Sequence, residues 1–206
     1  MSKTKDAIAL LKADHEKVKG IFEKFEKSDS QEEKNSLIDQ ALEELKVHAE
    51  VEEELFYPAL RGEVENDLMN EADEEHHVAR ILIAELEEGD EEDDERRNAK
   101  FTVLAEGIRH HIKEEEGEMM PQAKDAGVDL DSLGERIQER KNELMESGVP
   151  ADDEHQMVSD AGMKSGRSRR SGLSEERNSP SRETTSVAGS KAKSSRKSTS
   201  RTKRSV

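Results

Sequence analysis

The sequence predicts an all-α fold, and its composition and the spacing of its apolar residues are the observations that predict it. Ala, Glu, Lys and Leu recur along the 206 residues, prolines number only four, and no stretch alternates β-branched residues. Charged residues make up 40% of the chain and aromatic residues 2%, so we expect one modest domain without a large apolar core. We predict that this domain spans residues 1–147 as a four-helix bundle with a short fifth helix at its C-terminal end.

The helix boundaries follow from capping residues and glycines. The helices are expected at about residues 5–27, 32–60, 64–88, 95–125 and 130–147. Ser30 and Glu33 have the spacing of a capping box at the start of the second helix. Gly62, Gly89 and Gly127 follow the second, third and fourth helices, a common position for glycine. Because the connections are short, consecutive helices should lie antiparallel to one another.

The last part of the chain, residues 148–206, differs in composition from the rest. Gly148 and Pro150 end the fifth helix, and the residues that follow are rich in Ser, Arg and Lys with few large apolar side chains. Such a segment buries too little surface to offset its ordering entropy, so we predict a disordered basic tail. The tail could contact nucleic acid, an anionic surface or the acidic bundle, although a solubilising role is the simpler interpretation.

The residue types that are missing restrict the chemistry. The chain has no Cys, which excludes disulfides, thiolate zinc sites, thiol nucleophiles and cysteine-bound iron–sulfur clusters. Any metal must therefore be held by nitrogen and oxygen atoms. The first residues lack the apolar stretch of a secretory signal, and no window is long and apolar enough to cross a bilayer. We therefore expect a cytoplasmic protein.

Polar residues interrupt the apolar stripe that each of the four main helices should bury. Tracing each stripe at spacings of three and four places a histidine on every helix and a glutamate on two of them. These interior polar residues are His15, His48, Glu52, His76, His111 and Glu115. On the second helix the stripe continues through Leu55 and Ala59.

Such a layer of buried imidazoles and carboxylates needs a compensating charge. A buried carboxylate without a partner costs several kcal/mol or takes up a proton. Two divalent or trivalent cations would supply the charge. Mixed imidazole and carboxylate ligation favours iron or manganese over a four-coordinate structural zinc, although zinc is compatible with the same donors.

The second and fourth helices also repeat one another. HAEVEEELFYP at residues 48–58 and HIKEEEGEMMP at residues 111–121 share the initial His, a Glu four residues later, another Glu beside it and a Pro ten residues after the His. The first and third helices each supply one stripe histidine preceded by an acid, in Asp14-His15 and Glu75-His76. One helix-pair unit therefore occurs twice, as a two-metal site with approximate twofold symmetry requires. A spacing of four lets each His and Glu of a repeat reach a common ion.

These residues carry a resemblance to a known family. The segments DHEKV, HAEVEEELFYPAL, EEHHVARILIAEL and HHIKEEEGEMMP make residues 5–147 resemble the hemerythrin-like HHE cation-binding family. The resemblance implies an up-down-up-down four-helix bundle around a non-haem di-iron centre bridged by carboxylates and an oxo or hydroxo group. It implies that the six interior polar residues are the ligands, with Glu52 and Glu115 as the bridging ones. The oxygen carriers of this family have a fifth histidine where this chain has Arg80, which implies an open or water-filled position on one iron and disfavours simple reversible oxygen carriage.

Several neighbouring residues offer alternatives. His77 could replace His76 as the ligand from the third helix. Tyr57 could hydrogen-bond near the site, although a place in the wall of the core is the simpler interpretation. The remaining glutamates of the repeats and two further histidines are not expected to bind metal: Glu53, Glu54, Glu114, Glu116, His110 and His155.

Three functions are compatible with the sequence. The leading hypothesis is a binding or sensing module whose di-iron site takes up oxygen, nitric oxide or iron itself, rather than an enzyme. The second is an oxidoreductase that acts on peroxide or nitrogen oxides, for which the sequence shows no additional acid, base or substrate pocket. The third is a structural bundle whose histidines pair with carboxylates and whose basic tail recruits a partner. The oligomeric state does not follow from the sequence.

Overall fold

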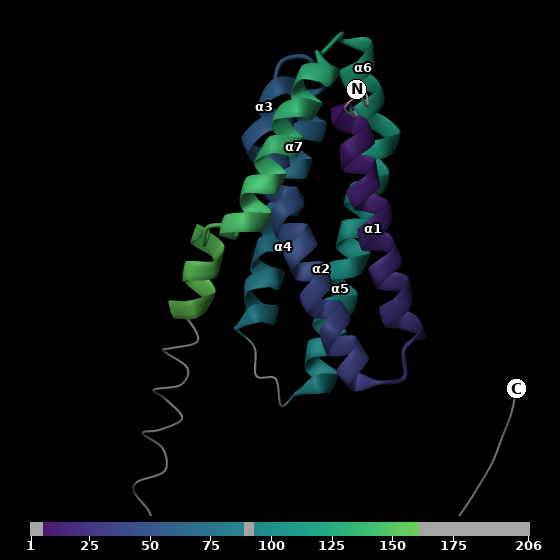
Figure 1. Ribbon diagram of the computed structural model, residues 1–206, viewed down its shortest axis with the longest axis vertical. Coiled ribbons are helices and arrows are strands. Elements are labelled where there is room, and N and C mark those ends of the chain that lie inside the picture. The colour runs from purple at the N-terminus through teal and green to yellow at the C-terminus, as the bar shows by residue number, and fades with distance from the viewer. Residues whose placement is uncertain (1–5, 89–92, 161–206) are drawn as a thin grey trace, which may run out of the picture.

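The computed structural model describes residues 6–88 and 93–160 (Figure 1). In chain order the elements are α1 (Ala7–Lys27), α2 (Gln31–Val51), the π-helical turn η1 (Glu52–Phe56), α3 (Tyr57–Leu60), α4 (Asn66–Glu87), α5 (Asp94–Glu114), the π-helical turn η2 (Glu115–Met119), α6 (Met120–Asp125) and α7 (Leu130–Ser147). The elements α2, η1 and α3 follow one another without a break, as do α5, η2 and α6. The all-α prediction and its helices are confirmed, and the described residues contain no β-strand.

Side-chain caps and glycines set the ends of these helices. The Ser30 side chain accepts a hydrogen bond from the Glu33 backbone N–H, which is one half of the expected capping box. The Glu33 carboxylate accepts from the Ser28 hydroxyl instead of closing the box. Gly62 and Gly127 lie in the left-handed region, with φ of 88° and 77°, which permits the chain to turn after α3 and α6. Gly89 falls outside the described residues.

Four long helical rods form the bundle, and α7 runs lengthwise beside the half of it that contains α3 and α6 (Figure 1). The rods are α1, α2 with its extension, α4, and α5 with its extension, and they alternate in direction (Figure 1). The helix α7 packs against α1 and α2 and buries Leu133, Ile137 and Leu144. No helix in the described part of the chain is long and apolar enough to cross a membrane.

The apolar core consists of two clusters that lie on either side of the polar layer. One contains Phe22, Phe25 and Phe101 near the α1–α2 connection. The other contains Phe56 and Tyr57 and includes the buried face of α7. The histidines and glutamates predicted to bind metal lie between these clusters, so that packed side chains exclude bulk water from both ends of the layer.

The two π-helical turns change which residues face the interior. Each begins at the interior glutamate of a repeat, Glu52 or Glu115. A π turn holds an additional residue, so interior positions beyond it shift along the chain. The expectation that Leu55 and Ala59 continue the buried stripe was therefore wrong, because both are only partly buried. The fully buried positions are Phe56, Tyr57 and Leu60.

The first residues after α7 include a helical segment. We predicted a disordered tail from residue 148 onward, but residues 153–160 are helical. Interactions with α4 hold this segment in place, since Asp152 accepts a hydrogen bond from Arg80 at 2.7 Å and Glu154 contacts the His77 ring nitrogen at 2.7 Å. His155 lies 3.4 Å from the Glu87 carboxylate. The basic residues of the predicted tail, from 161 to 206, fall outside the described residues.

Candidate metal centre

All six residues predicted to bind metal are buried in one layer of the bundle. Their exposed fractions are 1% for His15, 7% for His48, 0% for Glu52, 5% for His76, 4% for His111 and 1% for Glu115. Of the two adjacent histidines on α4, His76 points inward, whereas the side chain of His77 is 47% exposed. The six buried residues occur at helical spacings of three and four within the stripes, and this spacing directs their side chains towards one interior point.

One ligand set involves the first two helices and the second repeat. His15, His48, Glu52 and Glu115 each offer one donor atom, and these atoms lie within 4.8 Å of one another. The Nε2 atoms of His15 and His48 are 3.1 Å apart. A Glu52 oxygen lies 3.1 Å from the Nε2 atom of His48, and a Glu115 oxygen lies 3.3 Å from that of His15. Two imidazoles and two carboxylates around one point could hold a divalent or trivalent cation.

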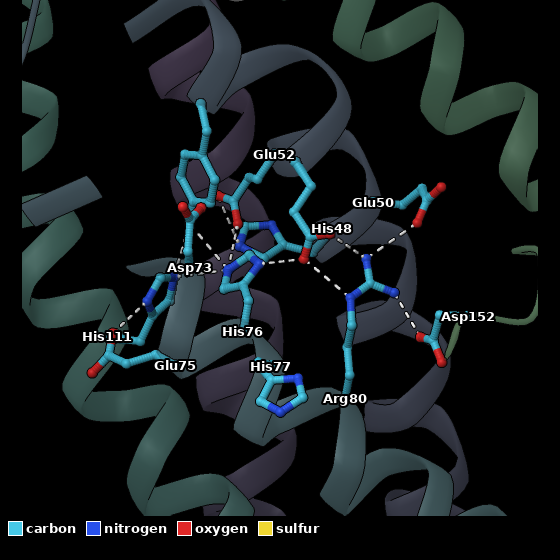
Figure 2. Close-up of polar contacts among 12 residues, drawn as sticks. His48, Glu50, Glu52, Asp73, Glu75, His76, His77, Arg80, His111 and Asp152 are labelled. Carbon is cyan, nitrogen blue, oxygen red and sulfur yellow. Dashed lines mark hydrogen bonds and ion pairs between the residues drawn. The ribbon is translucent and has the colours of Figure 1, made fainter. Parts of the chain in front are cut away.

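The second set lies beside the first and shares a carboxylate with it. Glu52, His76 and His111 form this group, and the Nε2 atoms of the two histidines are 3.3 Å apart. One Glu52 oxygen faces His48, while the other lies 3.4 Å from the His76 Nε2 atom. Figure 2 shows this arrangement, with the Glu52 side chain reaching down between the histidines. Glu115 also approaches both sets, since its oxygen near His15 is 3.9 Å from the His111 Nε2 atom.

Carboxylates on the outer side fix the orientation of the rings. The Nδ1–H group of His15 donates to Glu116 at 3.0 Å, that of His76 to Glu53 at 2.9 Å and that of His111 to Glu75 at 2.8 Å. With the proton on Nδ1, the lone pair of Nε2 points inward, as a metal ligand requires.

The fourth histidine has a weaker partner of the same kind. The His48 Nδ1 atom lies 3.6 Å from Asp14, which is beyond hydrogen-bond distance, and Lys141 binds the other oxygen of this aspartate. The carboxylates therefore follow the repeat. Glu53 of the first repeat binds the α4 histidine, and Glu116 of the second repeat binds the α1 histidine. In the same way, Asp14 faces the α2 histidine and Glu75 binds the α5 histidine. The approximate twofold symmetry of the sequence includes these supporting groups.

Tyr57 breaks that symmetry. It occupies the position in the first repeat at which the second repeat has Met120. The Tyr57 hydroxyl lies 3.0 Å from the His76 Nε2 atom and 3.3 Å from the His111 Nε2 atom. It therefore contacts the inward nitrogens of the second set as well as forming part of the core wall. The one sequence signal for this role is its position, nine residues after His48 in the repeat.

The electrostatics of the layer favour bound cations. None of the four oxygen atoms of Glu52 and Glu115 has a hydrogen-bond partner among the described residues. Burial and then the charge of Glu115 raise the pKa of Glu52 well above its usual range. Burial would also raise the pKa of Glu115, but the nearby His15 and His111 outweigh this effect and hold it at about 2.

The histidines lead to the same conclusion. The His76 and His111 rings both donate from Nδ1, so in their neutral forms the Nε2 lone pairs face each other at 3.3 Å. Burial lowers the pKa of His48 to about 4, so this ring is a neutral donor at physiological pH. Opposed lone pairs and unpaired carboxylate oxygens in a dry interior fit positive ions and disfavour an empty layer.

Arg80 lies at the edge of the site and does not point into it. Its guanidinium binds Glu53 at 2.8 Å, Glu50 at 3.2 Å and Asp152 at 2.7 Å (Figure 2). Glu53 in turn accepts the hydrogen bond from His76. Burial alone would raise the pKa of Glu53, but His76 and Arg80 outweigh this effect and lower the pKa to about 2. Arg80 thus connects the outer side of a metal-facing ring to the segment that follows α7.

A small apolar cavity adjoins the histidines on the side away from Tyr57. Its volume is about 20 Å³. Apart from the four histidines, it is lined mainly by aliphatic residues that include Val18, Leu45, Ile83 and Ile108. Val18, Leu45 and Ile108 lie one turn from a histidine in the direction of the α1–α2 connection, and Ile83 lies two turns from His76 in the same direction. Tyr57 lies in the opposite direction. A volume of this size accommodates one water-sized or diatomic molecule.

Comparison with known proteins agrees with the helical fold and with cation binding. Residues 6–123 match the family described as hemerythrin HHE cation binding domain. The structure is similar to a crystal structure of a hemerythrin HHE cation binding domain-containing protein from Mycobacterium kansasii, with a TM-score of 0.55 and 25% sequence identity, over 71% of this chain and 95% of that one. No curated protein matches the chain significantly. The chain belongs to the hemerythrin HHE cation-binding domain family.

Proposed function

We propose that the protein binds two iron ions in the layer of six interior polar residues and that this centre takes up a small diatomic ligand. The first set would hold one ion through His15, His48 and both glutamates, and the second would hold the other through His76, His111 and the shared Glu52. The placement of Glu52, with one oxygen facing each set, is the observation that carries this proposal.

The donor atoms favour iron over zinc. Two carboxylates approach both sets, and the Tyr57 hydroxyl lies within 3.3 Å of both Nε2 atoms in the second set. Oxygen-rich mixed ligation suits iron or manganese, whereas structural zinc takes four closed positions that usually include thiolates. We propose Tyr57 as a further ligand of the second ion, on the side of the layer opposite to position 80, where the missing fifth histidine implies an open position. Bound iron would supply redox chemistry and a coordination position for the small ligand.

The protein's own residues position and isolate this chemistry. The outer carboxylates accept hydrogen bonds from the Nδ1 atoms of His15, His76 and His111, which directs the Nε2 atoms of these rings towards the metal positions. The two apolar clusters exclude water, and the cavity of about 20 Å³ beside the four histidines offers space for a molecule of diatomic size. Among the described residues, the acids and bases that line this cavity are the four histidines, Asp14 and Arg80, and the last two are engaged in ion pairs. This lining favours binding over turnover.

Metal quantitation on protein loaded with iron tests the proposal. Wild-type protein should hold two iron ions per chain, and a His48→Ala/His111→Ala double variant, which loses a ligand from each set, should lose about 100-fold or more in affinity. His77→Ala is the matched control, because this neighbour of His76 is exposed and should leave the iron content unchanged. Equal iron contents in wild type and double variant would contradict the assignment.

Optical spectroscopy tests the ligand. Nitric oxide or oxygen added to the reduced, iron-loaded protein should change the near-ultraviolet and visible bands of the metal centre, and the change should be absent from the metal-free protein. An unchanged spectrum in protein that retains two iron ions per chain would rule out diatomic binding while leaving metal binding intact.

A further inference from the structure

A surface groove between α4 and α5 reaches the same histidines from the outside. Its volume is about 380 Å³, and its lining is mostly apolar, with Val78, Leu82, Val103 and Gly107 among the residues that form it. Val78 and Val103 are 55% and 56% exposed, which makes them two of the four large apolar side chains that the described residues expose to solvent. Apolar residues gathered along one groove mark a binding or passage site more often than scattered ones do.

The groove and the internal cavity share a wall. Four residues line both spaces, namely His76, Ala79, Ile108 and His111. The two histidines are buried, whereas Ala79 and Ile108 are only partly buried and are therefore reached by solvent from the groove side. A methyl group and an isoleucine side chain thus separate the surface from the cavity beside the candidate metal centre. Rotation of one such side chain takes picoseconds to nanoseconds when it is exposed.

We infer that the groove between α4 and α5 is the route by which a neutral, apolar diatomic molecule reaches the metal centre, through the wall formed by Ala79 and Ile108. This inference rests on the proposed function. We expect the molecule that uses this route not to be an anion, because Glu71, Glu74 and Glu75 line the groove and repel negative charge. The apolar wall also disfavours charged molecules, because they would lose their hydration without gaining a partner.

A different opening suits polar molecules. A second surface pocket of about 530 Å³ reaches Tyr57 and Glu53 from the other side of α4 and is lined largely by charged side chains, including Arg61, Asp73 and Arg80. The two openings therefore differ in polarity, and the route of an anion need not be that of a neutral gas.

Gly107 permits a direct test of the route. A Cβ atom built at this helical glycine meets no atom within 4 Å, so a side chain can start here without a clash at its first carbon. Gly107→Phe should partly fill the groove while leaving every residue of the metal layer in place. Gly20→Phe is the matched control, because Gly20 also lies within a long helix, has the same free space and is not part of the groove.

The measurement is stopped-flow association of nitric oxide with the reduced, iron-loaded protein. Gly107→Phe should slow association by about tenfold, while Gly20→Phe should match the wild type. Ile108→Ala, which removes part of the shared wall, should accelerate association by a similar factor. Iron content and the visible spectrum of each variant show that the metal centre itself is unchanged.

Azide binding to the oxidised protein tests the selectivity for neutral molecules. Its rate should be the same in Gly107→Phe and wild type, and equal slowing of azide and nitric oxide would overturn the claim that the groove selects neutral molecules. Nitric oxide rates that agree within twofold among wild type, Gly107→Phe and Ile108→Ala would refute the route alone. If the wild-type protein holds two iron ions but binds no nitric oxide, both the proposed binding of a diatomic ligand and the proposed route are refuted.

Discussion

Replacing Glu52, the carboxylate that both sets share, should stabilise the metal-free protein and abolish its stabilisation by metal. In a Glu52→Met variant, a carboxylate that is 0% exposed becomes an apolar side chain of similar length. Neither of its oxygen atoms has a hydrogen-bond partner among the described residues, and burial raises its pKa well above the usual range, so the substitution removes a desolvation cost and few favourable contacts. The sign is the opposite of that for most substitutions of buried residues, which destabilise a protein.

The expected size follows from similar replacements of buried charges. Exchanging a buried ionic group for a well-packed apolar one stabilises by about 1–4 kcal/mol, so the metal-free Glu52→Met variant should gain roughly 2 kcal/mol in free energy of unfolding. For a domain of this size that corresponds to an increase in melting temperature of about 4–8 °C. Conversely, a metal present at 100 times its dissociation constant should stabilise the wild type by about 2.7 kcal/mol and leave the variant unaffected.

Urea unfolding followed by circular dichroism measures both effects, with and without iron. Glu106→Met on the exposed side of α5 is the control for the chemical change and should stay within about 0.5 kcal/mol of the wild type. A metal-free Glu52→Met variant that is less stable than the metal-free wild type would show that the Glu52 carboxylate is satisfied without a cation. Equal stabilisation of variant and wild type by iron would show that the metal binds elsewhere.

Two further substitutions test the groups around the centre. Tyr57→Phe should retain iron but lose any phenolate-to-iron absorption in the visible spectrum of the oxidised protein, and identical spectra would show that the hydroxyl is not a ligand. Arg80→Met should destabilise the metal-free protein at pH 7 by about 1–3 kcal/mol, because Glu53 loses a charged hydrogen-bond partner. The pKa of Glu53 is lowered to about 2, so the ionised carboxylate stabilises the fold at pH values above the usual pKa of a glutamate. This stabilisation is lost as the pH falls from about 5 towards 2. Urea unfolding should therefore show a smaller difference between Arg80→Met and wild type at pH 2 than at pH 7, and a difference that does not depend on pH would contradict this role.

The internal repeat was the strongest sequence signal for the site. A histidine and a glutamate four residues apart, with a proline at the same later position, place His48, Glu52, His111 and Glu115 on inward faces irrespective of how the helices pack. The structure places all four in one layer. The sequence stripe also favoured His76 over His77, and the structure turns His76 inward.

Contacts between helices were harder to infer. The acids that precede His15 and His76 in the sequence, Asp14 and Glu75, face the histidines of the next helix rather than their own neighbours. Helical geometry explains this difference, since adjacent residues point about 100° apart and cannot share a partner on one side. The pairing depends on how two helices are rotated relative to each other, which sequence spacing does not specify.

By itself, the sequence determined where the helices lie, which face of each is buried and which polar residues interrupt that face. These properties are local, because they follow from the 3.6-residue period of a helix and from capping residues. Only the tertiary structure decided that π-helical turns move Phe56 and Leu60 into the core, that the Tyr57 hydroxyl reaches His76, and that a groove between α4 and α5 shares a wall with the inner cavity. Each of these depends on how far one helix is shifted or rotated against another, and such displacements are set by packing across the whole bundle.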